Sequence, residues 1–178
     1  MKSRQELAQY FNKLGFTYGA EIGVGLGRGA VILCQGIPDL KLICVDNWVG
    51  KPNNYEFTRK RLNDLKYKVI FIRKNSMEAV KDITNNSLDF VFIDANHQYQ
   101  YVMEDITEWS KKVRPSGIVA GHDYYTSGKV GVVRAVNDYT RLHNIKFELT
   151  EISIRTQSYT EKRDNEEPCY YWVKKGLT

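Results

Sequence analysis

The sequence lacks the features that mark membrane-spanning and disulfide-rich proteins. No apolar run approaches the roughly 20 residues that cross a bilayer, and the first residues, MKSRQELAQYF, carry charges where a signal peptide is apolar. The three cysteines, Cys34, Cys44 and Cys169, are an odd number and show neither CxxC nor CxxxH spacing. We therefore expect a soluble, cytoplasmic protein without a membrane partner, in which Cys34 and Cys44 lie in the core.

The chain also lacks a block of one charge. Its 26 basic and 21 acidic residues give a net charge of +5 and are scattered along the sequence. Scattered lysines are ordinarily solvated surface residues, although an excess of positive charge also suits an anionic substrate. No strip of alternating basic and aromatic residues is present, which argues against a nucleic-acid partner.

No internal repeat, low-complexity tract or interdomain linker interrupts the 178 residues, of which 42% are hydrophobic. This length and composition suit one domain with one sizeable core. We expect a single domain over residues 1–178, with an N-terminal helix in 1–15, a cofactor-binding core in 16–143 and a strand pair in 144–178.

Short apolar runs alternate with helical patterns, which predicts an α/β, Rossmann-like, doubly wound sheet with helices on both faces. Strands are expected at 18–24, 40–46, 69–72, 88–94, 118–121, 147–154 and 168–173, and the helices between them at 30–35, 54–65, 76–83, 102–113 and 131–142. The first helix has a capping box, Ser3 with Glu6, and ends at Gly15.

Two helices have expected buried faces. In residues 54–65 the face contains Phe57, Leu62 and Leu65. In the helix that follows the fourth strand, apolar residues recur at intervals of four, three and four, which is a helical period. These residues are Val102, Ile106, Trp109 and Val113.

The first strand-to-helix turn contains four glycines, Gly23, Gly25, Gly27 and Gly29, preceded by Glu21. Glycines let the backbone approach a ligand, and Asp46, at the end of the second strand, is placed to accept hydrogen bonds from a ribose diol. Three alternatives stay open for this turn. Its GxGxxA spacing fits a nicotinamide dinucleotide, its glycines could simply pack helix on sheet, or it binds S-adenosylmethionine. A carboxylate ahead of the turn would repel a pyrophosphate and attract a sulfonium and an ammonium, which favours the last.

A second group of polar residues follows the fourth and fifth strands. Asp94 and His97 come after the fourth, and His122 and Asp123 after the fifth, so a parallel sheet brings them to one edge. An acceptor hydroxyl is activated by a positioned base or by a metal, and His97 is the candidate base. Carboxylates suit Mg²⁺, whereas an imidazole ligand suits a softer divalent cation. Alternatively, Asp94 caps a helix and His122 bonds the backbone.

Five segments resemble, in order, the motifs of class I S-adenosylmethionine-dependent methyltransferases. They are EIGVGLGRGA, VDNW, KNSMEAV, LDFVFIDANHQY and VRPSGIVAGHDY, within roughly residues 15–140. The last two are similar to those of the metal-assisted O-methyltransferases, which include macrolide-sugar O-methyltransferases and the cephalosporin hydroxylase-like group. The resemblance implies a mostly parallel seven-stranded sheet with an antiparallel last strand. It also implies methyl transfer to a hydroxyl of a small-molecule or saccharide acceptor.

The resemblance also assigns roles to residues. Glu21, Gly23 and Gly25 would contact the methionine part of the cofactor, Asp46 the ribose hydroxyls, and Trp48 with Ser76 the adenine, with Trp48 as a plain core aromatic being the alternative. Other cofactor-binding residues would be Gly27, Asn47 and Asp94. Catalysis would fall to His97 as base and to Asp94. Asp94, His122 and Asp123 would hold a metal. In the relatives the metal ligands are the first aspartate of the fourth-strand motif and an acidic pair after the fifth strand, and His122 departs from that pattern, because the macrolide-type enzymes have a carboxylate there.

Two other function classes remain as alternatives, a nicotinamide-dependent oxidoreductase and a non-catalytic nucleotide-binding module. The acceptor pocket is expected near Tyr124, Tyr125 and Lys129, with solvent-exposed loop residues as the alternative. Without a separate cap domain, either a large acceptor docks from outside or a second subunit completes the pocket in a homo-oligomer.

Overall fold

The structure is a computed structural model that describes residues 1, 3–50, 52–125, 130–151 and 168–176. Within these residues the chain forms a seven-stranded sheet of order β3-β2-β1-β4-β5-β7-β6. The strands are β1 (Tyr18–Ile22), β2 (Lys41–Val45), β3 (Lys68–Ile72), β4 (Leu88–Ile93), β5 (Val113–Gly121), β6 (Glu148–Leu149) and β7 (Tyr170–Val173). All neighbours from β3 to β5 are parallel, and β7 is antiparallel to β5 and β6. The predicted Rossmann-like fold is confirmed.

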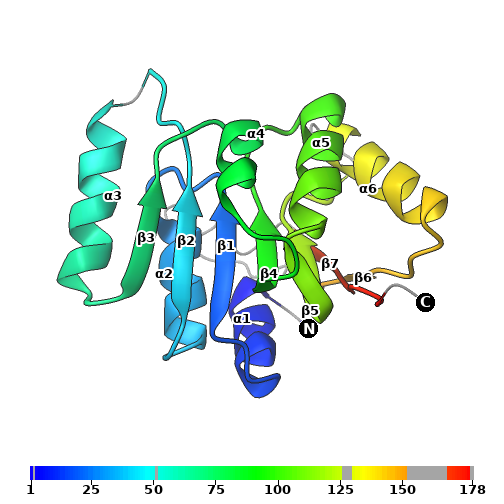
Figure 1. Ribbon diagram of the computed structural model, residues 1–178, viewed down its shortest axis with the longest axis horizontal. Helices are drawn as coiled ribbons and strands as arrows, with labels where there is room; N and C mark the ends of the chain where they lie inside the picture. Colours follow the sequence, from blue (N-terminus) through cyan, green and yellow to red (C-terminus); the bar gives the residue numbers. More distant parts are fainter. Residues whose placement is uncertain (2, 51, 126–129, 152–167, 177–178) are drawn as a thin grey trace.

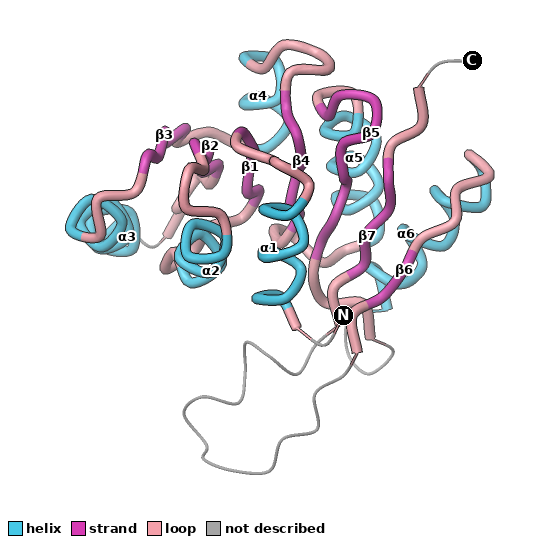
Figure 2. Tube along the Cα trace, turned by 90° about the horizontal axis from the view of Figure 1, so that it is seen from below, coloured by secondary structure: helices cyan, strands magenta, loops and turns pink. Residues whose placement is uncertain are grey.

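Helices cover both faces of the sheet (Figures 1 and 2). On one face lie α1 (Arg4–Lys13), α2 (Arg28–Gly36) and α3 (Pro52–Asp64). On the other lie α4 (Ser76–Ala79), the 3-10 turn η1 (Val80–Asp82), α5 (Tyr99–Ser110) and α6 (Val130–Leu142). Each face buries its own apolar cluster, with Phe11, Leu33 and Phe90 in the first and Ile22, Val91 and Trp109 in the second. Strands covered on both sides explain the continuous apolar runs of the sequence.

Helix α1 begins and ends where its sequence signals predict. Ser3 Oγ accepts a hydrogen bond of 3.2 Å from the amide of Glu6, and Gly15 has a φ of 74° just beyond the helix. Among the described helices, none is long and apolar enough to cross a membrane. Cys34 and Cys44 are buried, as expected.

The expected buried face of α3 is wrong. Leu62 is fully buried, but Phe57 is 55% exposed and Leu65 is 46% exposed. The inward stripe contains Thr58 and Leu62, which are four residues apart, together with the half-buried Tyr55 three residues earlier. Residues 57 and 62 are five apart, a spacing that places them on different sides of a helix.

The expected boundary between α5 and β5 is also wrong. Helix α5 ends at Ser110, and Val113 opens β5 instead of closing the helix. Its buried side chain continued the helical period by coincidence. Pro115 and Gly117 lie inside β5, where the pairing register with β4 shifts between Leu88 and Phe90. This irregularity accommodates a proline, which cannot donate to a regular ladder. Lys129 and residues 152–154 of the strand expected at 147–154 lie outside the described residues.

Candidate active site

The glycines of the β1–α2 turn have different structural roles. Gly23, Gly25 and Gly27 have φ values of 88°, 53° and 74°, which disfavour any residue with a side chain. A Cβ on Gly25 would meet no atom within 4 Å, whereas one on Gly23 would lie 2.2 Å from the carbonyl oxygen of Asp94. A Cβ on Gly29 would lie 2.0 Å from Glu21 Oε1. Gly25 therefore leaves open space, whereas Gly23 and Gly29 allow close packing.

A pocket of about 900 Å³ opens at the carboxyl ends of β1, β2 and β4. It lies where the strand order reverses between β1 and β4, the usual ligand position in an open α/β sheet. Its volume suits a nucleoside-sized molecule. The lining consists of Ile22, Gly23, Gly25, Val45, Asp46, Asn47, Lys74, Asn75, Ser76, Met77, Asp94, Ala95, Asn96, Tyr101, Glu104 and Asp105.

The charged side chains of this lining are mostly acidic. Four carboxylic acids, Asp46, Asp94, Glu104 and Asp105, stand against one ammonium, that of Lys74. Lys74 is itself ion-paired with Asp82, which is not part of the lining. The pocket therefore favours a ligand with positive charge over one with a diphosphate.

Asp46 joins the end of β2 to the glycine turn. Its Oδ2 accepts hydrogen bonds from the amides of Val24 at 3.0 Å and Gly25 at 2.8 Å, and its Oδ1 accepts one from the amide of Trp48 at 2.8 Å. A carboxylate offers about four acceptor positions, so roughly one remains for a ligand hydroxyl.

Polar side chains also cross-link the far wall of the pocket. Asn47 Nδ2 donates to Asn75 Oδ1 at 2.6 Å. The Ser76 hydroxyl donates to Asp105 Oδ1 and accepts a hydrogen bond of 2.7 Å from Trp109 Nε1. Burial raises the pKa of Asp105 to about 6, against the opposing effect of the Ser76 hydroxyl. Within the described part of the chain, Asp105 Oδ2 has no hydrogen-bond partner.

Trp48, Gly27 and Glu21 lie outside the pocket lining. Trp48 is 3% exposed, donates its Nε1–H to the carbonyl oxygen of Gly25 at 2.9 Å and packs against Tyr55, which matches the core alternative. Gly27 is the N-cap of α2, where a Cβ would lie 2.8 Å from Thr58 Cγ2.

Glu21 is buried behind the turn, because strand alternation places it on the face covered by α1 and α2, beside Cys44 and Phe92. Burial raises the pKa of Glu21 to about 8, despite the nearby Arg4 guanidinium and a hydrogen bond from the amide of Ala30. Glu21 therefore does not line the pocket, and the four acids of the lining are the groups that a cationic ligand would meet.

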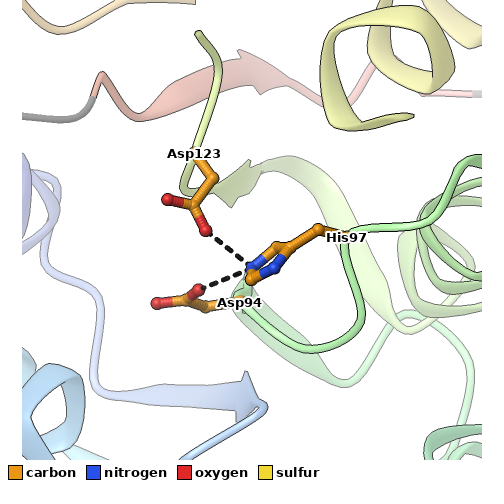
Figure 3. A group of neighbouring side chains, drawn as sticks. All are labelled: Asp94, His97 and Asp123. Carbon is orange, nitrogen blue, oxygen red and sulfur yellow. Dashed lines mark ion pairs between the residues drawn. The ribbon is translucent and has the colours of Figure 1, made fainter. Parts of the chain in front are cut away.

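The second predicted group does come together, beside the pocket (Figure 3). His97 Nε2 lies 2.6 Å from Asp123 Oδ2 and 3.7 Å from Asp94 Oδ1. Asp94 and His97 come from the end of β4, and Asp123 follows β5 with a φ of 63° and an exposure of 1%. One ligating atom from each of the three side chains fits within 4.8 Å of the others, a spacing that can hold a metal ion.

His122 lies next to this group instead of within it. Its Nδ1 is 3.2 Å from Asp123 Oδ1 and 3.9 Å from Asp94 Oδ2, and the residue is 7% exposed. The three-residue group therefore contains His97 where the sequence placed His122. Burial would raise the pKa of Asp94, but the hydrogen bond from His97 and the charges of Arg4 and His122 lower it below its ordinary value. Asp94 is thus a carboxylate near neutral pH.

Sequence reasoning missed Arg4, Glu104 and Asp105. Arg4 had a usable signal, since it stands at helical spacing from the apolar residues Leu7, Ala8 and Phe11 and so belongs to the buried stripe. Asp105 had none, because an acid beside the apolar Ile106 is equally typical of a solvated helix face. Of the two tyrosines expected to shape an acceptor pocket, Tyr124 donates its hydroxyl to Asn137 Oδ1 at 2.8 Å, and Tyr125 is half-buried.

Comparison with known proteins agrees with this geometry. A family described as a methyltransferase domain matches residues 20–124. The uncharacterized protein y4gI of Sinorhizobium fredii is 30% identical over 114 residues, which cover 58% of this chain and 12% of that protein. The uncharacterized protein R132 of Acanthamoeba polyphaga mimivirus is 29% identical over 126 residues, 67% of this chain and 57% of that protein. The chain thus spans a small part of one curated relative and just over half of the other.

Solved structures share the fold at low identity. An O-methyltransferase from Bacillus cereus in complex with S-adenosylhomocysteine superposes with a TM-score of 0.72 at 15% identity, covering 96% of this chain and 80% of that one. The O-methyltransferase TomG from Streptomyces achromogenes, involved in tomaymycin synthesis and in complex with S-adenosylmethionine, gives 0.74 at 17% identity, covering 97% and 79%. The chain belongs to the methyltransferase-domain family, and its fold is that of the class I S-adenosylmethionine-dependent methyltransferases.

Proposed function

We propose that this protein transfers a methyl group from S-adenosylmethionine to a hydroxyl oxygen of a small-molecule or saccharide acceptor. The observation that carries the proposal is the acidic pocket at the strand-order reversal, with the His97 group at its edge. A sulfonium and an α-ammonium suit four carboxylic acids, whereas the diphosphate of a nicotinamide dinucleotide does not. The cofactors and products named in the two solved O-methyltransferases support the same conclusion.

The lining suggests how the cofactor lies. Asp46 takes the ribose hydroxyls with its remaining acceptor position, beside Asn47. The methionine part extends past Gly23 and Gly25 toward Asp94, and the adenine faces Ser76 and Asp105 at the other end. In the proposed arrangement, the methyl group lies near the carboxyl end of β4.

His97 is the proposed base, and Asp94 supports it. Methyl transfer is an in-line displacement at carbon, so the protein mainly holds the acceptor oxygen near the methyl group and removes the hydroxyl proton. His97 Nε2 lies between Asp94 and Asp123, whose two carboxylates stabilise the positive charge that the ring acquires with that proton.

The same three residues fit a divalent cation. Asp94, His97 and Asp123 would hold it, and when bound it would act as a Lewis acid that favours the alkoxide form of the acceptor, in place of proton removal by His97. Two oxygens and one imidazole nitrogen suit Mn²⁺ or Zn²⁺ better than Mg²⁺. If the metal is required, EDTA treatment abolishes methyl transfer and Mn²⁺ restores it; full activity in EDTA would assign the site to His97 as base alone.

The proposal is tested by methyl transfer from tritiated S-adenosylmethionine to a panel of sugars and phenols, together with calorimetric titration of S-adenosylhomocysteine. We expect His97→Gln and Asp94→Ala to lower transfer by about a hundredfold or more, with S-adenosylhomocysteine still bound. His143→Gln is the matched control, because His143 is exposed and packs only on Tyr139 among the ring contacts of the described residues. Unchanged transfer in both site variants would contradict the assignment.

A further inference from the structure

Arg4 is an arginine buried inside the protein. It is the first residue of α1, it is 6% exposed, and its guanidinium carbon lies 4.9 Å from the ring centre of Phe92. Arginine is almost never buried without a partner, because desolvation of its charge is costly. The buried position of Arg4 therefore depends on the side chains that interact with its guanidinium.

Those partners are two acidic side chains, one from β1 and one directly after β4. Arg4 Nη2 donates to Asp94 Oδ2 at 3.1 Å, and Glu21 is near enough to interact electrostatically with the guanidinium. Gly29 makes room for this group, because a Cβ there would lie 2.9 Å from Arg4 Nη1 as well as 2.0 Å from Glu21 Oε1. Gly29 thus leaves space for the Arg4 and Glu21 side chains and does not line the pocket.

The Arg4 contact fixes how the Asp94 carboxylate is turned. Oδ2 is bound to the guanidinium, which leaves Oδ1 directed at His97 Nε2, 3.7 Å away. His97 in turn lies 2.6 Å from Asp123. The four side chains thus form a row of contacts that begins on the N-terminal helix and ends after β5.

We infer that Arg4 is a positioning residue that sets the orientation of the His97 ring through Asp94. This inference rests on the proposed function in one respect, the role of His97 as the base. Without the guanidinium, Asp94 keeps the His97 and His122 rings as its neighbours, so its carboxylate turns toward them and the His97 ring is displaced. The first turn of α1 therefore belongs to the active site, although Arg4 does not line the pocket.

The test reads the histidine rings directly and needs neither cofactor nor acceptor. The chain has three histidines, so a long-range ¹H–¹⁵N spectrum resolves each ring, and His97→Gln assigns the signal of interest. Spectra at one fixed pH are compared for the parent, Arg4→Met and Ser3→Ala. Ser3→Ala removes the N-cap of the same helix but keeps the guanidinium, so it reports the effect of a loosened α1 alone.

We expect the His97 ring signals to shift in Arg4→Met and to stay at the parent position in Ser3→Ala. If Arg4→Met does not fold, the double variant Arg4→Met/Glu21→Gln replaces it, because Gln at position 21 removes the buried acid that would otherwise lose its cationic partner. Glu21→Gln alone is then the control. An unshifted His97 in a folded Arg4 variant, or an equal shift in Ser3→Ala, would overturn the inference. Titration of S-adenosylhomocysteine into the parent tests the proposed function separately.

Discussion

At the scale of single residues, Glu21 shows how a motif residue can differ from its expected role. The sequence placed a negative charge in front of the glycine turn, but the side chain lies on the α1 and α2 face of β1, and burial raises its pKa to about 8. Glu21 pairs with Cys44 of β2 and Phe92 of β4, so all three side chains point to the same face of the sheet. This face can be assigned only from the pairing register of the strands, which the sequence does not give.

The raised pKa of Glu21 has a consequence for stability. An acid that ionises at its ordinary value of 4.5 when unfolded but at about 8 when folded binds more protons in the folded state, so it lowers the free energy of unfolding as the pH rises between about 5 and 8. Glu21→Gln should remove this loss, which is roughly 2–5 kcal/mol across the window. Urea unfolding at several pH values measures it. If the free energy of unfolding of parent and variant depended on pH in the same way, the raised pKa of Glu21 would be contradicted. A large loss of S-adenosylhomocysteine affinity in Glu21→Gln would show that Glu21 contacts the ligand.

Asp105 makes a separate prediction about the adenine. Asp105 lines the pocket, and its carboxylate can accept a hydrogen bond from an exocyclic amino group. The parent should therefore bind S-adenosylhomocysteine about tenfold or more tightly than S-inosylhomocysteine, which presents a carbonyl there. Asp105→Asn should lose most of that preference, while Glu104→Gln, at the neighbouring acid of the lining, should keep it. Calorimetry with both ligands measures this preference. If the parent and Asp105→Asn preferred S-adenosylhomocysteine equally, Asp105 would not contact the adenine.

At the scale of elements, the β1–α2 turn contains glycines of two kinds, which two alanine variants should separate. Gly25→Ala places a side chain at a φ of 53° on the pocket wall, so it should weaken cofactor binding and cost about 1–2 kcal/mol of stability. Gly29→Ala should mainly destabilise the fold, because its Cβ meets Glu21 and Arg4. Calorimetry and urea unfolding of both variants measure the difference. Loss of binding without loss of stability in Gly29→Ala would contradict it.

The elements themselves were largely predictable, because alternating apolar runs and helical periods specify a doubly wound sheet. The boundary errors have local causes. Val113 continues the period of α5 although it opens β5, and the residues of α3 that bury their side chains are spaced differently from the largest apolar ones. All three members of the candidate group, Asp94, His97 and Asp123, were named from the sequence, but the expected metal ligands included His122 in place of His97. Whether His97 or His122 joins Asp94 and Asp123 depends on the conformation after the strand ends, including the positive φ of Asp123.

At the scale of the whole molecule, the charge of the pocket differs from that of the chain. The protein carries a net charge of +5, yet four of the five charged side chains that line the pocket are acidic. A scattered basic surface therefore says nothing about the ligand, and only the folded arrangement brings Asp46, Asp94, Glu104 and Asp105 to one cleft.

The most direct test of this account is the side-by-side calorimetric titration of S-adenosylmethionine, sinefungin and NAD into the parent protein. The account predicts that the two cationic nucleosides bind and that NAD does not, and that Glu104→Gln weakens the binding of the two cationic nucleosides. Binding of NAD with no heat from S-adenosylmethionine or sinefungin would contradict the claim that the acidic pocket selects a cationic cofactor.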